Sequence, residues 1–444
     1  MTEKKDASTE TPSPDTVTVK SVGFFDSGLK PTRKRVLIQW ARTVSILCVF
    51  ILGILSLFWA SRLRVTENLY RLTVWVVDFD SPGSAKEPFV GPAIIDVATS
   101  LTGVGVGYSI QDPADFDYNP MAVRQRVYDQ KAYAAIVINP NATSRLLDAV
   151  RYQIDYTPAS AGQIITVSAR EPDTFSNYLT PALDSFERQA LLSFGPLWVH
   201  KLVSEFPNTT TWTGAAVSPA IGFQRVDLRP FTPAVAGPAV TIGLIYLIIL
   251  AFFIFPFLMP VHSQLLTNAT RLRLSHWIIW RIISNLVAYF FLSLFYSFVS
   301  LAFQIPFSNS SRPGTEPAAN ATPYSHGSFV VFWMLNWVGM AALGFPCENM
   351  AMVLGSPWSS FFLIFWVISN VATGFYSIDL APGFFAWGYA WPIHRIVEAL
   401  RTIIFGTHSR IGLDFGILFA WVAVSIAFFP FATHVMLWKM KRRR

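Results

Sequence analysis

Six long apolar runs, five of them after residue 236, dominate the chain. A helix that crosses a membrane needs about 20 consecutive apolar residues. Six segments satisfy this length, at about 36–60, 237–260, 278–304, 328–348, 357–378 and 412–437. This pattern predicts a polytopic α-helical membrane protein with six spans.

The region between the first two runs, residues 61–236, alternates strand and helix signals. "RLTVWVVDFDSPG" and "YAAIVINP" are typical of strands, and "GPAIIDVATSLTG", "NPMAVRQRVYDQK" and "NATSRLLDAV" of helices. "RYQIDYTP", at 151–158, predicts another strand. Such alternation indicates a small α/β domain inserted between spans one and two. We expect a helical stalk over 160–204 and an extended linker over 207–235.

The stretch "WPIHRIVEALRTIIFGT", at 391–407, places charges among apolar residues. Pro392 suits a first helical position and Gly406 a C-cap. The helix between them covers about 14 residues and about 21 Å, whereas the hydrocarbon core needs about 30 Å. We therefore expect an amphipathic outer helix at 392–405, and not a seventh span.

One face of this helix carries the candidate pathway or lid residues, which are His394, Arg395, Glu398 and Arg401. Arg395–Glu398 and Glu398–Arg401 have the i,i+3 spacing of ion pairs. The functional hypothesis is a lid or a contact to lipid headgroups. The alternative is an interfacial helix that only packs the bundle.

Glu348, at the end of the fourth span, is the other candidate. An ionisable group within the membrane is a functional candidate by default. The alternative is a solvated residue at a helix end, because Pro346 indicates that the helix breaks there.

Composition and charge support a membrane protein. Hydrophobic residues make up 52% and charged residues 14% of the chain, against about 25% charged in soluble domains. The net charge of +7 does not indicate nucleic acid, because its basic runs at 33–35 and 439–444 flank apolar runs. We expect a disordered cytosolic tail at 1–35 and a basic cytosolic end at 439–444. Both termini are then cytosolic, and the plasma membrane is favoured over internal membranes.

In this orientation residues 61–236 are extracytosolic. Four Asn-X-Ser/Thr sequons fall on the outer side and predict a glycoprotein. Their acceptors are Asn141, Asn208, Asn309 and Asn320.

Three stretches carry a family resemblance. They are "VYDQKAYAAIVINPNAT" (127–143), "VDLRPFTPAVAGPAVTIGLIYLIILAFF" (226–253) and "GYAWPIHRIVEALRTIIFGT" (388–407). Together they resemble the fungal nitrosoguanidine-resistance membrane-protein family, which is built on a domain of unknown function. That family is similar in layout to the phage-infection protein and to ABC-2-type permeases. The likeness covers about residues 36–438.

The resemblance implies resistance to small toxic compounds, by permease-like export or by organising membrane lipid. It also implies an ABC-2-like domain of five spans at 237–438, and a homodimer, since six spans are half of an ABC-2-type pathway. No Walker A motif is present. A permease of this kind needs a separate ATPase, another driving gradient, or none.

The chain has no HExxH, no GxSxG and no Cys/His ligand spacing. We therefore expect no enzyme, no catalytic residues, no cofactor and no metal. Cys48 and Cys347 lie in separate apolar runs, which excludes a disulfide framework.

Two other functions remain open. One is a scaffold or sensor that does not transport, whose external domain binds a partner. The other is a luminal metal-dependent transferase that uses Asp78 and Asp80 in "VVDFD". Ordinary strand-to-turn chemistry explains the same two residues.

Overall fold

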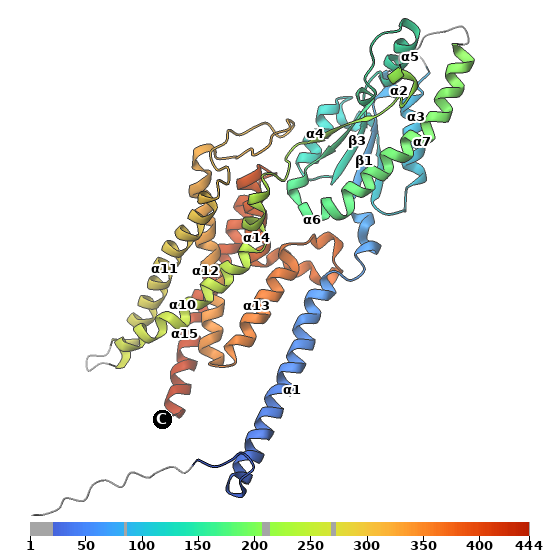
Figure 1. The fold of residues 1–444 in the computed structure, drawn as a ribbon. Coiled ribbons are helices and arrows are strands. Elements are labelled where there is room, and N and C mark those ends of the chain that lie inside the picture. The colour runs from blue at the N-terminus through green and yellow to red at the C-terminus, as the bar shows by residue number, and fades with distance from the viewer. Residues whose placement is uncertain (1–20, 84–86, 207–213, 268–271, 444) are drawn as a thin grey trace, which may run out of the picture. The chain divides into compact units, whose positions relative to one another are not determined.

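The computed structural model describes residues 21–83, 87–206, 214–267 and 272–443 (Figure 1). Residues up to Gly53 form one unit, and residues from Ile54 onward form a second. Helix α1 (Lys30–Ser61) crosses this boundary. Its first part presents exposed apolar side chains, as a lone membrane helix does.

A five-stranded mixed sheet lies within residues 61–236, which we call the sheet domain. Its strands run in the order β2-β1-β3-β4-β5, and only the β3–β4 pair is antiparallel. All five residues of β3 are buried, as its unbroken apolar run predicts for a central strand. The strands are β1 (Thr73–Asp78), β2 (Gly107–Gln111), β3 (Ala134–Ile138), β4 (Gly162–Thr166) and β5 (Phe223–Asp227).

Helices cover both faces of this sheet. One face packs against α3, α5 and α7, and the other packs against α4. The apolar sides of these amphipathic segments close the two cores. The helices of the domain are α2 (Asp80–Gly83), α3 (Val90–Ser100), α4 (Pro120–Tyr128), α5 (Ala142–Tyr152), α6 (Pro172–Thr174), α7 (Thr180–Glu205) and α8 (Gly214–Val217).

Three sequence predictions for this domain are wrong. The predicted stalk helix α7 instead lies along the sheet, because Phe186, Phe194 and Trp198 are buried in the core. The strand predicted at 151–158 is the end of α5 and a loop. Strands β4 and β5 lie in segments predicted as stalk and linker. Each has five residues, too few for a clear alternating pattern.

The C-terminal half is a helical bundle built around α12, which contacts α10, α11, α13, α14 and α15. Within the described residues, five helices, α1 included, are long and apolar enough to cross a membrane. Helix α13 has 16 residues, about 24 Å, and is shorter than the predicted span. The bundle helices are α9 (Gly237–Val240), α10 (Gly243–Thr267), α11 (Leu274–Ala302), α12 (Ser328–Leu354), α13 (Ser359–Gly374), α14 (Pro392–Phe405) and α15 (Ile411–Arg443).

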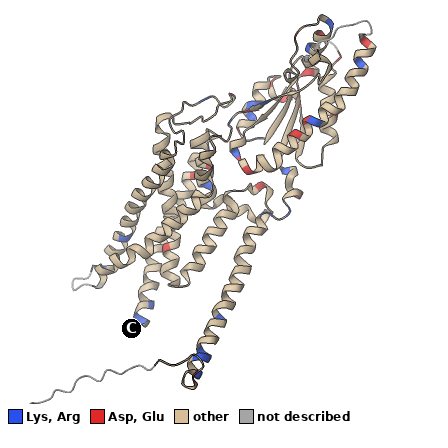
Figure 2. Cartoon of the chain, viewed as in Figure 1, with Lys and Arg blue, Asp and Glu red and all other residues tan. Residues whose placement is uncertain are grey.

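Charged residues are concentrated in the sheet domain and near helix ends, and few lie inside the bundle (Figure 2). Helices of the bundle are apolar over most of their length. The few charges among them therefore require partners, and these charges define the candidate site.

Candidate functional site

Helix α14 begins and ends where the sequence predicts. Pro392 lies in its first turn, and Gly406 closes it with a φ of 68°. The Gly406 amide donates to the Thr402 carbonyl at 2.9 Å. Proline needs no partner for a missing amide in the first turn, and glycine adopts positive φ without strain. The predicted bounds 392–405 are confirmed.

Both faces of α14 are covered by protein. On the apolar face, Ile396, Leu400 and Ile403 are fully buried in the bundle core. On the polar face, Arg395 and Arg401 are each only 6% exposed. Helix α14 therefore packs against α12, α13 and α15, as the alternative of a helix that packs the bundle predicts. Its place on the outer side of the membrane stays a prediction. Amphipathicity predicts two unlike faces but not what covers each one.

The charged residues of α14 have specific partners. Arg401 Nη1 donates to Glu398 Oε1 at 2.9 Å, which confirms that predicted pair. Arg395 does not pair with Glu398. Its Nη1 donates to Asp414 Oδ1 of α15 at 3.3 Å, and its Nε donates to the Tyr389 carbonyl at 2.6 Å. Asp414 is fully buried, so its charge depends on this arginine.

His394 is uncharged at neutral pH. Burial lowers the pKa of His394 to about 4. Its Nδ1 lies 3.2 Å from the Thr373 carbonyl, and its ring contacts Tyr389 edge-on at 5.3 Å. The two arginines of α14 lie against the carboxyl groups of Glu398 and Asp414.

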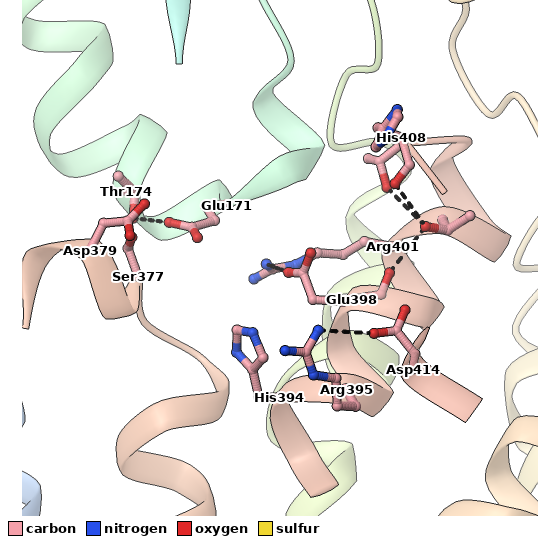
Figure 3. A network of polar contacts seen from close by, with 12 residues as sticks. Glu171, Thr174, Ser377, Asp379, His394, Arg395, Glu398, Arg401, His408 and Asp414 are labelled. Carbon is pink, nitrogen blue, oxygen red and sulfur yellow. Dashed lines mark hydrogen bonds and ion pairs between the residues drawn. The ribbon is translucent and has the colours of Figure 1, made fainter. Parts of the chain in front are cut away.

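The sheet domain contributes further polar groups to this region (Figure 3). Tyr133 of the sheet domain donates at 2.6 Å to Asp379, which lies after α13, and Tyr389 donates to the same carboxyl group at 2.9 Å. Glu171 accepts from Thr174 at 2.9 Å. Burial raises the pKa of Glu171, although Arg401 and a neighbouring arginine oppose the rise. A sheet-domain carboxyl group thus shares its electrostatic environment with α14.

The end of α14 is also fixed to the sheet domain. Arg229 is 1% exposed. Its Nε donates to the Gly406 carbonyl at 3.0 Å, and Tyr128 donates to the same oxygen at 3.1 Å. The remaining guanidinium nitrogens donate to the carbonyls of Leu228, Arg312, Pro313 and Glu316. One buried guanidinium therefore joins β5, the loop before α12 and the C-cap of α14.

A second cluster lies inside the bundle around Glu348, which is 2% exposed. Its two oxygens accept from Arg281 and from Asn285, both on α11. The Arg281 guanidinium also lies over the rings of Trp277, at 4.8 Å, and Phe429, at 5.3 Å. The alternative of a solvated helix end at Glu348 is wrong, because α12 continues past Pro346 to Leu354.

Several buried polar atoms near Glu348 have no hydrogen-bond partner among the described residues. They are Nε of Arg281, Nε2 of His262 and Oδ1 of Asn349. His262 Nδ1 on α10 accepts at 3.2 Å from Trp280, the residue before Arg281 on α11. Unpaired buried groups cost free energy and are common where a ligand or a conformational change uses them.

Asp78 caps the turn after β1, and Asp80 accepts from residues at the starts of α3 and α5. Asp80 is fully buried, and its oxygens accept from the Thr143 amide, the Thr143 hydroxyl and the Gly91 amide. Asp78 accepts from the Asp80 amide at 2.8 Å. These donors occupy the oxygens that a metal would need, so the geometry supports the strand-to-turn interpretation.

The sequons differ in their surroundings. Asn141 is exposed at the start of α5. The Asn309 amide donates to the Asn320 carbonyl at 2.9 Å, and the Asn320 side-chain oxygen is buried. Asn208 lies outside the described residues.

A family described as a protein of unknown function, DUF3533, matches residues 43–427. The chain belongs to this DUF3533 family. It is also 26% identical over 451 residues to an uncharacterised endoplasmic reticulum membrane protein of Saccharomyces cerevisiae, covering 95% of this chain and 85% of that protein. No solved structure matches. The chain is therefore a membrane protein of an uncharacterised family.

For this DUF3533 member, the structure separates the predicted candidates into two groups. His394, Arg395, Glu398 and Arg401 form one cluster, and Glu348 belongs to the other. The sequence analysis missed Arg281, although this arginine lies inside the predicted span 278–304. An isolated charge in an apolar run is the signal that identifies it. Glu171 had no such signal, because it lies in a polar segment.

Proposed function

We propose that this protein is a permease-like exporter or lipid-organising component that confers resistance to small toxic compounds such as nitrosoguanidine. The supporting observation is the buried ion pair of Arg281 and Glu348 with Asn285, inside helices apolar enough to cross a membrane. Burying two charges gives no clear gain in stability. Ionisable groups inside membrane helices commonly serve substrate or ion pathways.

The proposal includes six crossings, with α13 as the short sixth span, the sheet domain outside and both termini in the cytosol. The basic residues before α1 and at the end of α15 support this orientation. The relative is named for the endoplasmic reticulum. That name favours an internal membrane over the plasma membrane that we expected from the sequence. A homodimer and a separate ATPase remain predictions.

The test measures how much labelled nitrosoguanidine accumulates in cells from which the protein has been deleted. The same cells are then measured after the unaltered protein or a variant has been reintroduced. Removing one partner of a buried pair costs about 3–5 kcal/mol, so Glu348→Gln alone does not separate folding from function. The double variant Arg281→Gln, Glu348→Gln removes both charges and avoids an unpaired one. We expect it to be inserted normally and to fail to restore low accumulation.

A matched control is Arg312→Gln, Glu316→Gln, which removes an exposed pair 3.9 Å apart and should restore low accumulation fully. If the buried double variant restored low accumulation as the unaltered protein does, the pair would be structural only. Unchanged accumulation in cells without the protein would contradict export and favour the scaffold or sensor.

A further inference from the structure

The span that enters the bundle from the sheet domain is broken near its start. The apolar segment Ala234–Leu266 is long enough to cross a membrane, yet it consists of α9 and α10 with an interruption at Thr241, where φ is −136° and ψ is −115°. The Thr241 hydroxyl donates to the Gly237 carbonyl at 2.7 Å. Broken helices occur at membrane depth where they line a cavity or are enclosed by protein.

A groove lies between this break and the end of α11. Its lining contains no charged residue. The polar groups in it are the hydroxyls of Thr241, Tyr246, Tyr296 and Ser300. The lining therefore suits an apolar ligand with few hydrogen-bonding groups.

Gly243 lines the groove where the broken backbone and α11 lie close together. A Cβ atom there would lie 2.4 Å from the Pro238 carbonyl oxygen and 3.1 Å from the Tyr296 hydroxyl. The absence of a side chain allows α11 to bring Tyr296 against the broken backbone. The break and the tyrosine therefore form one wall together.

The groove opens on the exposed surface of two apolar helices. Ile242 is 60% exposed, Tyr246 57% and Val299 58%, and all three lie on apolar spans. The lining lies at the ends of α10 and α11 nearest the sheet domain and the polar loop after residue 303. Tyrosines at such boundaries lie at the level of lipid headgroups.

The last turns of α1, around Phe58, pack against Ala372, Ala381 and Phe385, on and after α13, and none of these residues lines the groove. A charged peptide finds no partner in the lining. A lipid chain matches the apolar wall, the hydroxyl groups and the exposure to the bilayer.

We propose that this groove binds one acyl chain of a glycerophospholipid, with Tyr246 and Tyr296 beside the ester region. The inference goes beyond the proposed function and does not depend on export. Helix α9 also contacts α14, and Val240 shares the bundle core with Phe405. A bound lipid therefore lies one helix away from the charged face of α14.

The test uses the full-length protein in native membranes and a phospholipid with a photoreactive group in its acyl chain. Labelled peptides are mapped by mass spectrometry. Val299→Trp fills the groove, and Val287→Trp is the matched control on the same helix, since Val287 is 49% exposed outside the groove. We expect preferential labelling of 237–246 and 296–300, reduced several-fold by Val299→Trp and unchanged by Val287→Trp.

Uniform labelling along the exposed sides of α10 and α11 would mean ordinary surrounding lipid and would overturn the proposal. Preferential labelling of the groove by a photoreactive sterol would also overturn it. Cysteine crosslinks that show α1 or a second copy of the chain covering the groove would overturn it as well. Unchanged melting temperatures show that the variants are folded. Because labelling needs no transport, this test and the accumulation test can fail separately.

Discussion

Three of the four buried arginines among the described residues join separate elements of the fold. Arg229 donates to carbonyls alone, Arg281 donates to Glu348, and Arg395 donates to Asp414 and a carbonyl. A guanidinium costs free energy on leaving water and regains it only through well-placed acceptors. Gly406, Glu348 and Asp414 lie 177, 67 and 19 residues from their arginines, so these contacts join separate elements.

Arg229→Lys should destabilise the protein by about 2–4 kcal/mol, because a lost charged hydrogen bond costs about 1.5–3 kcal/mol and one ammonium cannot reach every carbonyl that the guanidinium holds. The measurement is thermal unfolding of the purified protein in detergent, together with protease cleavage in the loop 304–324. We expect a lower melting temperature and faster cleavage.

Arg225→Lys is the matched control. Arg225 lies on β5, just before Arg229 in the chain, is exposed and pairs with Asp184 and Glu187. Exposed pairs contribute little. An Arg229→Lys protein that unfolds like the control would show that the carbonyl contacts carry no stability.

At the scale of elements, α14 combines a short, charged sequence with deep burial. It is too short to span and carries several charges, yet it is buried at the centre of the bundle. Its two ends are held differently. The Tyr389 carbonyl and Asp414 hold the N-terminal half through Arg395, and the sheet domain holds the C-cap through Gly406. The sheet domain and α14 are therefore mechanically connected.

Gly406→Ala should weaken this connection. Gly406 has a φ of 68°, and a Cβ atom there would lie 3.0 Å from the Ala321 carbonyl oxygen. We expect a loss of about 1–2 kcal/mol of stability, because alanine is strained at positive φ and the carbonyl oxygen is too close. Thermal unfolding gives this value, and nitrosoguanidine accumulation shows whether the helix end matters for function.

Gly412→Ala provides the comparison. Gly412 lies in the first turns of α15 with no atom near its Cβ position, so alanine should be neutral or slightly stabilising there. Equal stability of the two variants would contradict a strained C-cap at Gly406.

Elements were predictable where their pattern is long or strongly marked. The bounds of α14 follow from Pro392 and Gly406, and β3 follows from its apolar run. Strands β4 and β5 were missed, because β5, in "FQRVD", buries only Phe223 and Val226. Such a short edge strand is determined by its pairing with β4, which is a tertiary contact.

At the scale of the molecule, the charged residues are distributed unevenly. Charged residues gather in the sheet domain and at helix ends (Figure 2), and the proposed orientation places that domain outside. Asn141 is exposed there, whereas the Asn309 amide is hydrogen-bonded to Asn320. Glycosylation therefore reports both orientation and local structure.

Asn141→Gln should remove one glycan and so increase electrophoretic mobility. After treatment with a glycosidase, the variant and the unaltered protein should migrate alike. Asn309→Gln, the control, should leave the mobility unchanged. An Asn141 site that never carries a glycan would argue against the sheet domain being outside the cytosol. A shift with Asn309→Gln would contradict the expected protection.

The sequence by itself determined the membrane class, the positions of most apolar helices and the end points of α14, because hydrophobic periodicity, chain length and helix caps are local properties. The tertiary structure decided what covers the polar face of α14, which helix supplies the partner of Glu348, and how α7 lies on the sheet. These depend on contacts between residues far apart in the chain. In a bundle, the free energy of a buried charge is set by those contacts and not by its neighbours in sequence.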